Sequence, residues 1–343
     1  MSSTLDARTG DRAAVMRLIF GAWLQQALYV AAKLDVADQL ATEPLPLPEL
    51  AARCGADPAA LGRFLRALVS VGVFDEPTPG VFALNGAAHY LRDDVPDSHK
   101  HIAILHGEEA YAAGTGALST ARTGRPGFEQ VYGMAYFDYL ASHPAARAAF
   151  DAAMGRQTAV PVVLAECDLG AARTVVDIGG GGGAFLAAVL DRLPGARGTV
   201  FDLPAGVEAA TKALADRGIA DRAEVVGGSC FESVPPGADL YTYVRVLHDF
   251  DDDQVLTALR TVRANAGPAS RLIVVDALLP ETPGFNPGRL ADLGMLLVLG
   301  GRYRTAAELC RLISAAGFEV TAIRQPPAGA DPRAESAVEA RLA

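Results

Sequence analysis

The chain has 343 residues, of which half are apolar and a fifth are charged, and its net charge is −10. This acidic balance argues against a nucleic-acid partner, and no apolar run is long enough to span a membrane. The six histidines show no metal-ligand spacing, so we expect no metal site. We expect a cytoplasmic protein with reduced thiols, because the N-terminus has no signal-peptide pattern and the four cysteines no C-x-x-C spacing (Cys54, Cys167, Cys230, Cys310).

The first part of the chain, to about residue 160, is predicted to be mainly helical. Residues 12–40 carry apolar side chains at helical spacing and include Trp23, the only tryptophan. A short helix over 48–53 and a second helix capped by Asp57 follow, and residues 73–84 have the pattern of a β-hairpin. The order helix, helix, hairpin is typical of a winged helix.

A winged helix can bind DNA, or it can serve as a lid or a dimerisation module. Residues 41–100 contain five Lys or Arg against eight Asp or Glu, and the would-be recognition helix carries only Arg63 and Arg66. Such a helix has little attraction for phosphates. The apolar surface of residues 18–40 also exceeds what one helix can bury within its own module. We therefore predict a homodimer rather than a DNA-binding regulator.

Near Ala172 the pattern changes to strands that alternate with helices, as in a parallel sheet covered on both faces. We predict seven strands, with the last two forming an antiparallel pair. The predicted strands are Thr174–Gly179, Thr199–Leu203, Ala223–Val226, Asp239–Val246, Leu272–Leu279, Phe318–Arg324 and Ser336–Leu342. In such a sheet, ligands bind at the carboxyl ends of the strands.

Five consecutive glycines, Gly179 to Gly183, follow the first of these strands. Glycine lets the backbone approach a ligand closely, and Asp202 ends the next strand about 20 positions further on, where a carboxylate grips a ribose. The same spacing fits a dinucleotide site. Asp177 decides between the two ligands, because a carboxylate repels a pyrophosphate but favours the cationic groups of S-adenosylmethionine (SAM). We therefore predict SAM as the cofactor.

The fourth predicted strand leads into a turn that contains His248. A histidine at the carboxyl end of a central strand points into the site, and His248 is the only histidine after His143. With an ordinary pKa of about 6.5, it is the side chain best suited to accept a proton at neutral pH. The carboxylates nearby, Asp249 among them, raise its basicity. The acidic residues 251–253 have the simpler role of complementing the dipole of the helix that they begin.

Four blocks of sequence together carry a family resemblance: Val176–Gly181, Phe201–Pro204, Val246–Asp252 and Gly300–Thr305. The chain resembles the class I small-molecule O-methyltransferases, which include plant caffeate and flavonoid enzymes and bacterial natural-product tailoring enzymes. The resemblance covers nearly the whole chain. It implies α/β architecture in three parts: a mostly helical winged-helix dimerisation domain (1–105), a helical linker that contributes to the substrate pocket (106–165) and a Rossmann-like seven-stranded methyltransferase domain (166–343).

The resemblance also implies roles for individual residues. His248 is implied to be the general base, supported by Asp276, with Asp249 beside it. The expected substrate contacts are Asp292, Met295 and Tyr303. The expected cofactor contacts are Asp177, Gly179, Gly181, Asp202, Ser229, Cys230, Phe231, Arg245, Met154 and Thr158.

Three positions depart from the family pattern. Ser229 replaces a common aspartate near the adenine, and Val244 replaces a frequent lysine. Tyr303 stands where an acidic residue usually flanks the base, so we expect His248 to be a weaker base than in the family at large. Relatives that decarboxylate, hydroxylate or guide cyclisations also depart near this site.

The sequence therefore predicts a SAM-dependent O-methyltransferase that acts on a phenolic or enolic hydroxyl of a small aromatic natural product. S-adenosylhomocysteine is the expected second product, and no metal is expected to take part. The alternative is a methyltransferase-like tailoring enzyme that binds SAM but catalyses a different reaction. No motif specifies the ring system of the acceptor.

Overall fold

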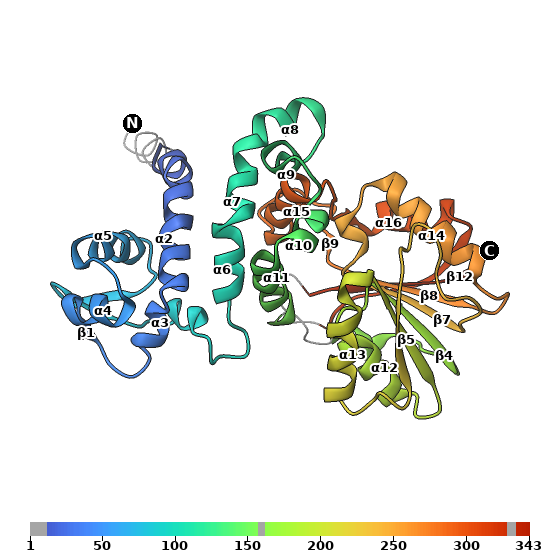
Figure 1. Cartoon of the computed structure of the whole chain (residues 1–343). Coiled ribbons are helices and arrows are strands. Elements are labelled where there is room, and N and C mark those ends of the chain that lie inside the picture. The colour runs from blue at the N-terminus through green and yellow to red at the C-terminus, as the bar shows by residue number, and fades with distance from the viewer. Residues whose placement is uncertain (1–11, 157–161, 328–333) are drawn as a thin grey trace. The chain divides into compact units, whose positions relative to one another are not determined.

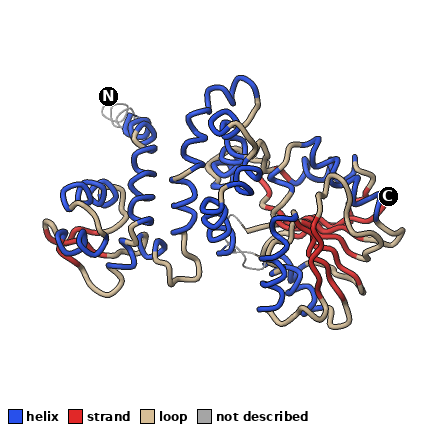
Figure 2. The backbone as a smooth tube through the Cα atoms, viewed as in Figure 1, coloured by secondary structure: helices blue, strands red, loops and turns tan. Residues whose placement is uncertain are grey.

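The computed structural model describes residues 12–156, 162–327 and 334–343. The chain divides into two compact units (Figures 1 and 2). The first unit comprises residues up to 112 together with the segment 143–157, and the second comprises 113–142 and the chain from 158 onward. The domain boundaries at 105 and 165 remain predictions. The glycine loop and His248 both lie in the second unit.

The first unit is helical apart from a small three-stranded sheet, and its strand order is β1-β3-β2. The predicted hairpin is confirmed, because β2 and β3 pair antiparallel, and Asp57 caps its helix by accepting the N–H of Ala60 at 2.8 Å. Its elements are the helix Arg12–Ile19, α2 (Gly21–Lys33), α3 (Val36–Gln39), β1 (Leu45–Pro46), α4 (Leu47–Cys54), α5 (Pro58–Val69), β2 (Asp75–Thr78), β3 (Val81–Ala83), α6 (Lys100–Gly107) and α11 (Pro144–Arg156), with α7 (Glu109–Ala113) at the boundary.

The N-terminal helices leave much apolar surface uncovered. Leu18 is 81 % exposed and Trp23 is 69 % exposed. Within the described residues, no single helix is long and apolar enough to cross a membrane. The helix Arg12–Ile19 and α2, which meet at a 50° bend, satisfy that criterion only as a pair and only by length and composition.

The second unit contains the seven-stranded sheet that the sequence predicts, in the order β11-β12-β8-β7-β4-β5-β6. The final antiparallel pair is confirmed, and β12 also pairs antiparallel with β8, so it lies between β8 and β11. The strands are β4 (Thr174–Ile178), β5 (Arg197–Asp202), β6 (Ala223–Gly227), β7 (Leu240–Val244), β8 (Arg271–Asp276), β11 (Phe318–Arg324) and β12 (Ser336–Leu342).

One predicted strand is wrong in its extent. The sequence pattern joins 272–279 into a single strand, but β8 ends at Asp276 and a separate strand β9 (Leu278–Leu279) follows. Strand β9 leaves the main sheet and pairs in parallel with β10 (Arg304–Thr305). A continuous apolar pattern cannot reveal this break, because it depends on a partner about 25 residues further along the chain.

Helices cover both faces of the main sheet. Helices α12 and α13 lie on one face and α14 and α16 on the other (Figure 1). Residues along each strand alternate between the two cores, so Val274 faces α14 and Val275 faces α12. The helices of this unit are α8 (Ala117–Thr123), α9 (Gly127–Tyr132), α10 (Tyr136–Ser142), α12 (Ala184–Arg192), α13 (Val207–Asp216), α14 (Asp252–Asn265), α15 (Pro287–Val298) and α16 (Ala306–Ala315).

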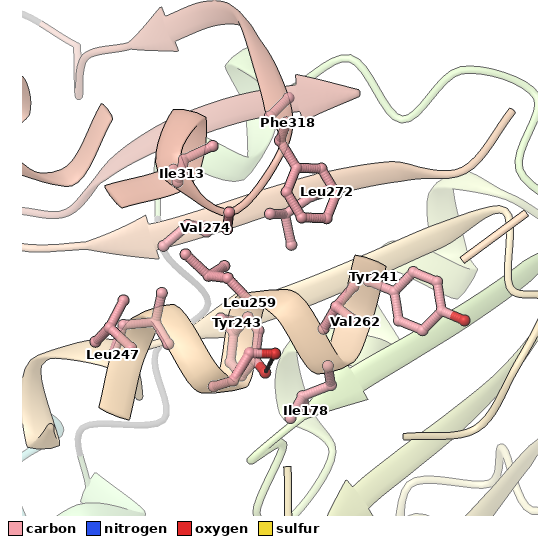
Figure 3. Packing of buried hydrophobic residues seen from close by; sticks show 14 of the residues in the cluster. Ile178, Tyr241, Tyr243, Leu247, Leu259, Val262, Leu272, Val274, Ile313 and Phe318 are labelled. Carbon is pink, nitrogen blue, oxygen red and sulfur yellow. Dashed lines mark hydrogen bonds between the residues drawn. The ribbon is translucent and has the colours of Figure 1, made fainter. Parts of the chain in front are cut away.

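The hydrophobic core between α14 and the sheet includes residues of β7, the strand that precedes the His248 turn. Leu259 and Val262 of α14 belong to one buried cluster with Tyr241 and Tyr243 of β7 (Figure 3). Asp251 caps this helix, accepting the N–H of Gln254 at 2.8 Å in a reciprocal capping box. The helix therefore begins at a fixed residue, directly after the turn that contains His248.

Replacing Leu259 by alanine tests this core. Leu259 is fully buried, so Leu259→Ala should lower the free energy of unfolding by about 2–5 kcal/mol, measured by urea denaturation. Leu118→Ala is the matched control, because Leu118 is 65 % exposed. The control should change stability by less than about 0.5 kcal/mol. Equal effects of the two substitutions would contradict the assignment of Leu259 to the core.

Candidate active site

The glycine loop is folded tightly against the end of β5. Gly179, Gly181 and Gly183 have φ values of +69°, +51° and +70°, which residues with a side chain rarely adopt. The backbone N–H of Gly181 donates to Asp202 Oδ2 at 2.8 Å, and the N–H of Gly179 donates to the carbonyl of Phe201 at 2.7 Å. These bonds bring the loop and the Asp202 carboxylate together at the carboxyl edge of the sheet.

Asp177 lies beneath this loop and is almost fully buried. Its Oδ1 accepts the hydroxyl of Thr242 at 2.6 Å, and its Oδ2 has no hydrogen-bond partner among the described residues. A Cβ on Gly180 would stand 2.6 Å from Oδ2, so the carboxyl group is directly below the loop. Burial, reinforced by the charge of Asp202, raises the pKa of Asp177 to about 7.

These features fit SAM better than a dinucleotide. A carboxyl oxygen that is buried without a partner favours a ligand that brings positive charge or donors, and it opposes a pyrophosphate. Asp202 is placed where a ribose is held in sheets of this kind. The residues present thus suit a nucleoside cofactor whose other end is cationic.

Ser229, Cys230 and Phe231 lie just beyond the end of β6. Gly228, which precedes them, donates its N–H to the carbonyl of Asp202 at 2.9 Å, so the segment is tied to the same edge. Burial raises the pKa of the Cys230 thiol to about 11, which keeps it a neutral thiol. The ring of Phe231 meets that of Phe250 edge to face, at 4.9 Å between centroids.

His248 lies in the 3-10 turn Leu247–Asp249, immediately after β7, and its side chain is 12 % exposed. Its Nδ1 is hydrogen-bonded to Asp276 Oδ1 at 2.6 Å, and its Nε2 lies 3.5 Å from Asp249 Oδ1. The ring of Tyr303 packs against the imidazole at 4.7 Å between centroids. His248, Asp249, Asp276 and Tyr303, four of the residues that the sequence assigns to the site, are therefore in contact here.

Charge around His248 makes it a stronger base than an ordinary histidine. Burial lowers the pKa of His248, but the carboxylates of Asp276 and Asp249 outweigh that effect and raise it to about 9. Burial also raises the pKa of Asp249 to about 6. Tyr303 adds no charge to the ring, so the two carboxylates beside it are those of Asp276 and Asp249. The expectation that His248 is a weaker base than in the family at large stays a prediction.

The residues expected at the substrate come from α15 and the loop that follows it. The backbone N–H of Tyr303 donates to Asp292 Oδ1 at 2.7 Å, and burial raises the pKa of the Tyr303 phenol. The carbonyl of Met295 accepts the N–H groups of Leu299 and Gly300 where α15 ends. Asp292, Met295 and Tyr303 thus belong to one continuous piece of structure beside His248.

Two predicted cofactor contacts cannot be placed at this site. Met154 lies on α11, in the first unit, and its approach to the cofactor stays a prediction. Thr158 lies outside the described residues. Across the residues that are described, no group of three or more His, Cys, Asp or Glu side chains is arranged to hold a metal ion.

The structure adds residues that the sequence reasoning missed. The Arg245 backbone has φ +58°, and its guanidinium Nη1 lies 3.3 Å from Glu335 Oε1, at the start of β12. No local pattern signals Glu335. Arg304 and Gly301 contact the His248 turn. Both lie in the block Gly300–Thr305, whose sequence indicates a family resemblance but not this contact.

A seven-stranded sheet with β12 inserted antiparallel, a glycine loop above a buried acid and a histidine after β7 together define a SAM-dependent methyltransferase. Family models refine this class. The O-methyltransferase domain matches residues 117–319, and the O-methyltransferase dimerisation domain matches residues 16–94. The chain belongs to this O-methyltransferase family, and the resemblance seen in the sequence is confirmed.

Individual relatives agree with the family. The phenazine O-methyltransferase PhzM of Lysobacter antibioticus is 42 % identical over 332 residues, covering 95 % of each chain. The mitomycin 7-O-methyltransferase MmcR has TM-score 0.90 at 36 % identity, covering 99 % of this chain and 100 % of that one. The O-methyltransferase NcsB1 from neocarzinostatin biosynthesis, solved with SAM and 2-hydroxy-5-methyl naphthoic acid, has TM-score 0.83 at 33 % identity, covering 93 % and 96 %.

These findings establish the cofactor and the type of enzyme. The protein is an O-methyltransferase that uses SAM, and its relatives are bacterial enzymes of natural-product biosynthesis. They do not favour the alternative reading, in which SAM is bound while another reaction is catalysed.

Removing the Asp202 carboxylate tests the placement of the cofactor. Asp202→Ala should weaken the binding of S-adenosylhomocysteine by about 1.5–3 kcal/mol, the range for a hydrogen bond to a charged group. Isothermal titration calorimetry measures this directly. Asp216→Ala, at the far end of α13, should bind as the wild type does. Equal affinity of the Asp202 variant and the wild type would mean that the ribose lies elsewhere.

Proposed function

We propose that this enzyme methylates a phenolic or enolic hydroxyl of an aromatic natural product, with His248 as the general base. The observation that carries the proposal is the buried His248–Asp276 pair at the carboxyl edge of β7 and β8. It lies on the same edge of the sheet as the glycine loop, because β4 and β7 are parallel neighbours. A base at that position is well placed to deprotonate an acceptor next to the cofactor.

The bond to Asp276 determines which nitrogen of the ring reacts. When Nδ1–H donates to Asp276 Oδ1, the lone pair of neutral His248 is on Nε2, and Nε2 can accept a proton. When bound, SAM supplies a methyl group already activated by its sulfonium. Nε2 then takes the hydroxyl proton as the acceptor oxygen bonds to the methyl carbon, and the electron pair of the broken carbon–sulfur bond stays on sulfur.

The side chains around the ring support this cycle. The carboxylates of Asp276 and Asp249 stabilise the imidazolium that forms, since two negative charges face it in a buried place. Tyr303, Asp292 and Met295 form the wall on the acceptor side. In this proposal, the cofactor is held by Asp177, Gly179, Gly181, Asp202, Ser229, Cys230, Phe231 and Arg245.

The names of the relatives support an aromatic acceptor. One is named for a phenazine and another for mitomycin, and NcsB1 was solved with a hydroxylated naphthoic acid. The aromatic rings near His248 suit a flat partner, because Tyr303 already packs against the imidazole.

We also propose a homodimer, built on the N-terminal helices. The support is the match to the dimerisation domain over residues 16–94 and the exposed apolar side chains on the same helices, among them Leu18, Ile19 and Trp23.

Substituting His248 tests the general base. His248→Ala should lower turnover on a neutral phenol by roughly 10²–10⁴-fold, because the phenol must then ionise unaided. S-adenosylhomocysteine affinity should change little. Suitable acceptors are a panel of hydroxyphenazines and hydroxynaphthoates with labelled SAM. His89→Ala, in the first unit, is the matched control and should keep the wild-type rate.

The pH dependence provides a second readout of the same variant. The pKa of His248 is raised to about 9, so the neutral form that can accept a proton becomes more abundant as the pH rises toward that value. Wild-type kcat/KM should therefore increase from pH 7 to about pH 9 and then level off. A variant lacking His248 that retains both the wild-type rate and this profile would refute the mechanism.

Light scattering tests the dimer. The wild type at micromolar concentration should have twice the 35.7 kDa mass of one chain. Leu18→Asp combined with Trp23→Asp should yield the single-chain mass, because charges on that surface oppose its burial. Leu118→Asp, an equally drastic change on exposed α8, should leave the mass doubled. A wild type with the single-chain mass would contradict the homodimer.

A further inference from the structure

The loop between α15 and α16 contacts the turn that carries His248 through several different atoms. This segment, residues 301–304, is called the brace. It is 53 to 56 residues from His248 along the chain, yet it reaches the backbone on both sides of that histidine and the strand that follows Asp276. None of these contacts involves the cofactor loop.

The strongest contact is the guanidinium of Arg304, which is buried and hydrogen-bonded through all three of its nitrogens. Its Nη1 donates to the carbonyl of Leu247 at 2.9 Å, and its Nη2 donates to the carbonyl of Phe250 at 2.8 Å. Nε and Nη2 also reach Asp252 Oδ1 at 2.9 and 2.8 Å, and Nη1 donates to the carbonyl of Arg302 at 3.2 Å. The guanidinium therefore donates four hydrogen bonds and is also paired with the Asp252 carboxylate.

These bonds enclose the catalytic turn. Leu247 precedes His248, and Phe250 follows Asp249, so one rigid planar group holds the turn at both ends. The exposed fraction of Arg304 is only 4 %. A buried guanidinium is costly unless its donors are satisfied, and two of the acceptors here are the carbonyls of Leu247 and Phe250, on either side of His248.

Gly301 provides a second contact, by close approach. A Cβ at this position would stand 2.2 Å from the carbonyl oxygen of His248 and 2.4 Å from the carbonyl carbon of Asp249. Only glycine lets the brace lie so near the turn. The contact is independent of Arg304, because it depends on the missing side chain rather than on hydrogen bonds.

The brace is also joined to the strand that carries Asp276. β10 begins at Arg304, which pairs in register with Leu278 of β9, two residues beyond Asp276. The side chain of Arg304 thus holds the histidine turn while its backbone holds the extension of the aspartate strand. Both partners of the 2.6 Å hydrogen bond are tied to one residue.

We infer that Arg304, assisted by Gly301, is a positioning residue that holds the His248 turn against Asp276 and so determines the orientation of the imidazole. Only the expected effect on turnover rests on the proposed function. The structural part of the inference, the pairing of His248 with Asp276, can be measured without any acceptor.

Titration of His248 is the direct test. The groups that face the ring are Asp276 from β8, Asp249 from the same turn, Arg245 from the end of β7 and the ring of Tyr303. If Arg304→Lys lets the turn move away from Asp276, the pKa of His248 should fall from about 9 toward the ordinary value of about 6.5. Heteronuclear NMR of histidine-labelled enzyme measures it, with the signal assigned by its loss in His248→Asn.

The same variant should show a split in its kinetics. Arg304→Lys should lower kcat by about 10²-fold, since a small misplacement of a catalytic group has effects of that size. KM and the affinity for S-adenosylhomocysteine should stay within about twofold of wild type, because the substitution replaces no residue of the acceptor wall or of the cofactor loop. Gly301→Ala, which keeps the Arg304 guanidinium, should likewise lower kcat and leave KM and the affinity for S-adenosylhomocysteine unchanged.

Arg302 offers a matched control in the same loop. Its guanidinium pairs with Glu308 at 2.8 Å and lies 3.6 Å from Asp252, but its side chain is 45 % exposed and it makes no contact with the turn carbonyls that Arg304 binds. Arg302→Lys should leave both the His248 titration and kcat at wild-type values. Thermal unfolding shows whether each variant is folded. If Arg304→Lys does not fold, Gly301→Ala is used for the test in its place.

Two results would overturn the inference. One is a folded Arg304→Lys or Gly301→Ala enzyme with the wild-type His248 titration. The other is a loss of stability and cofactor affinity in these variants while the titration is unchanged, which would mean a purely structural role. If the wild type methylates no acceptor, the proposed function fails, but the titration still decides the inference.

Discussion

The hydrogen bond between His248 and Asp276 is the contact on which the proposed chemistry depends. It joins the ends of two adjacent parallel strands, β7 and β8, whose register pairs Val244 with Val275. Because parallel strands end at the same edge, residues soon after each strand meet without a long connection. Burial alone lowers the pKa of an imidazole, but here the nearby carboxylates reverse that effect and produce a strong base.

The cofactor half of the site is built by other means on the same edge. Backbone N–H groups and glycine conformations shape the loop after β4, and the carboxyl groups of Asp202 and the buried Asp177 lie against it. Methyl transfer from a sulfonium requires mostly positioning and the removal of one proton. The backbone of the glycine loop suits the positioning of the cofactor, and the charged side chains around His248 suit the removal of the proton.

Tyr303 is the departure from the family pattern that lies against His248. An aromatic ring against the imidazole replaces a charge, and Asp249, adjacent in the chain to His248, lies near the nitrogen that Asp276 does not bind. The negative charge beside the ring therefore comes from Asp276 and Asp249. The surface beside it becomes less polar, which bears on the kind of acceptor that can pack there.

Features that depend on neighbouring residues were determined by the sequence itself. The strand before the glycines, Asp202 after β5 and the turn with His248 all have local patterns, and the seven strands follow from periodicity and spacing. Tertiary structure alone decided the break after Asp276, the contact of Arg245 with Glu335 and the bonds from Arg304 to the two sides of His248. Each of these pairs segments that are remote in the chain, and neither segment encodes its partner, because the contact exists only once the sheet and its loops have packed together.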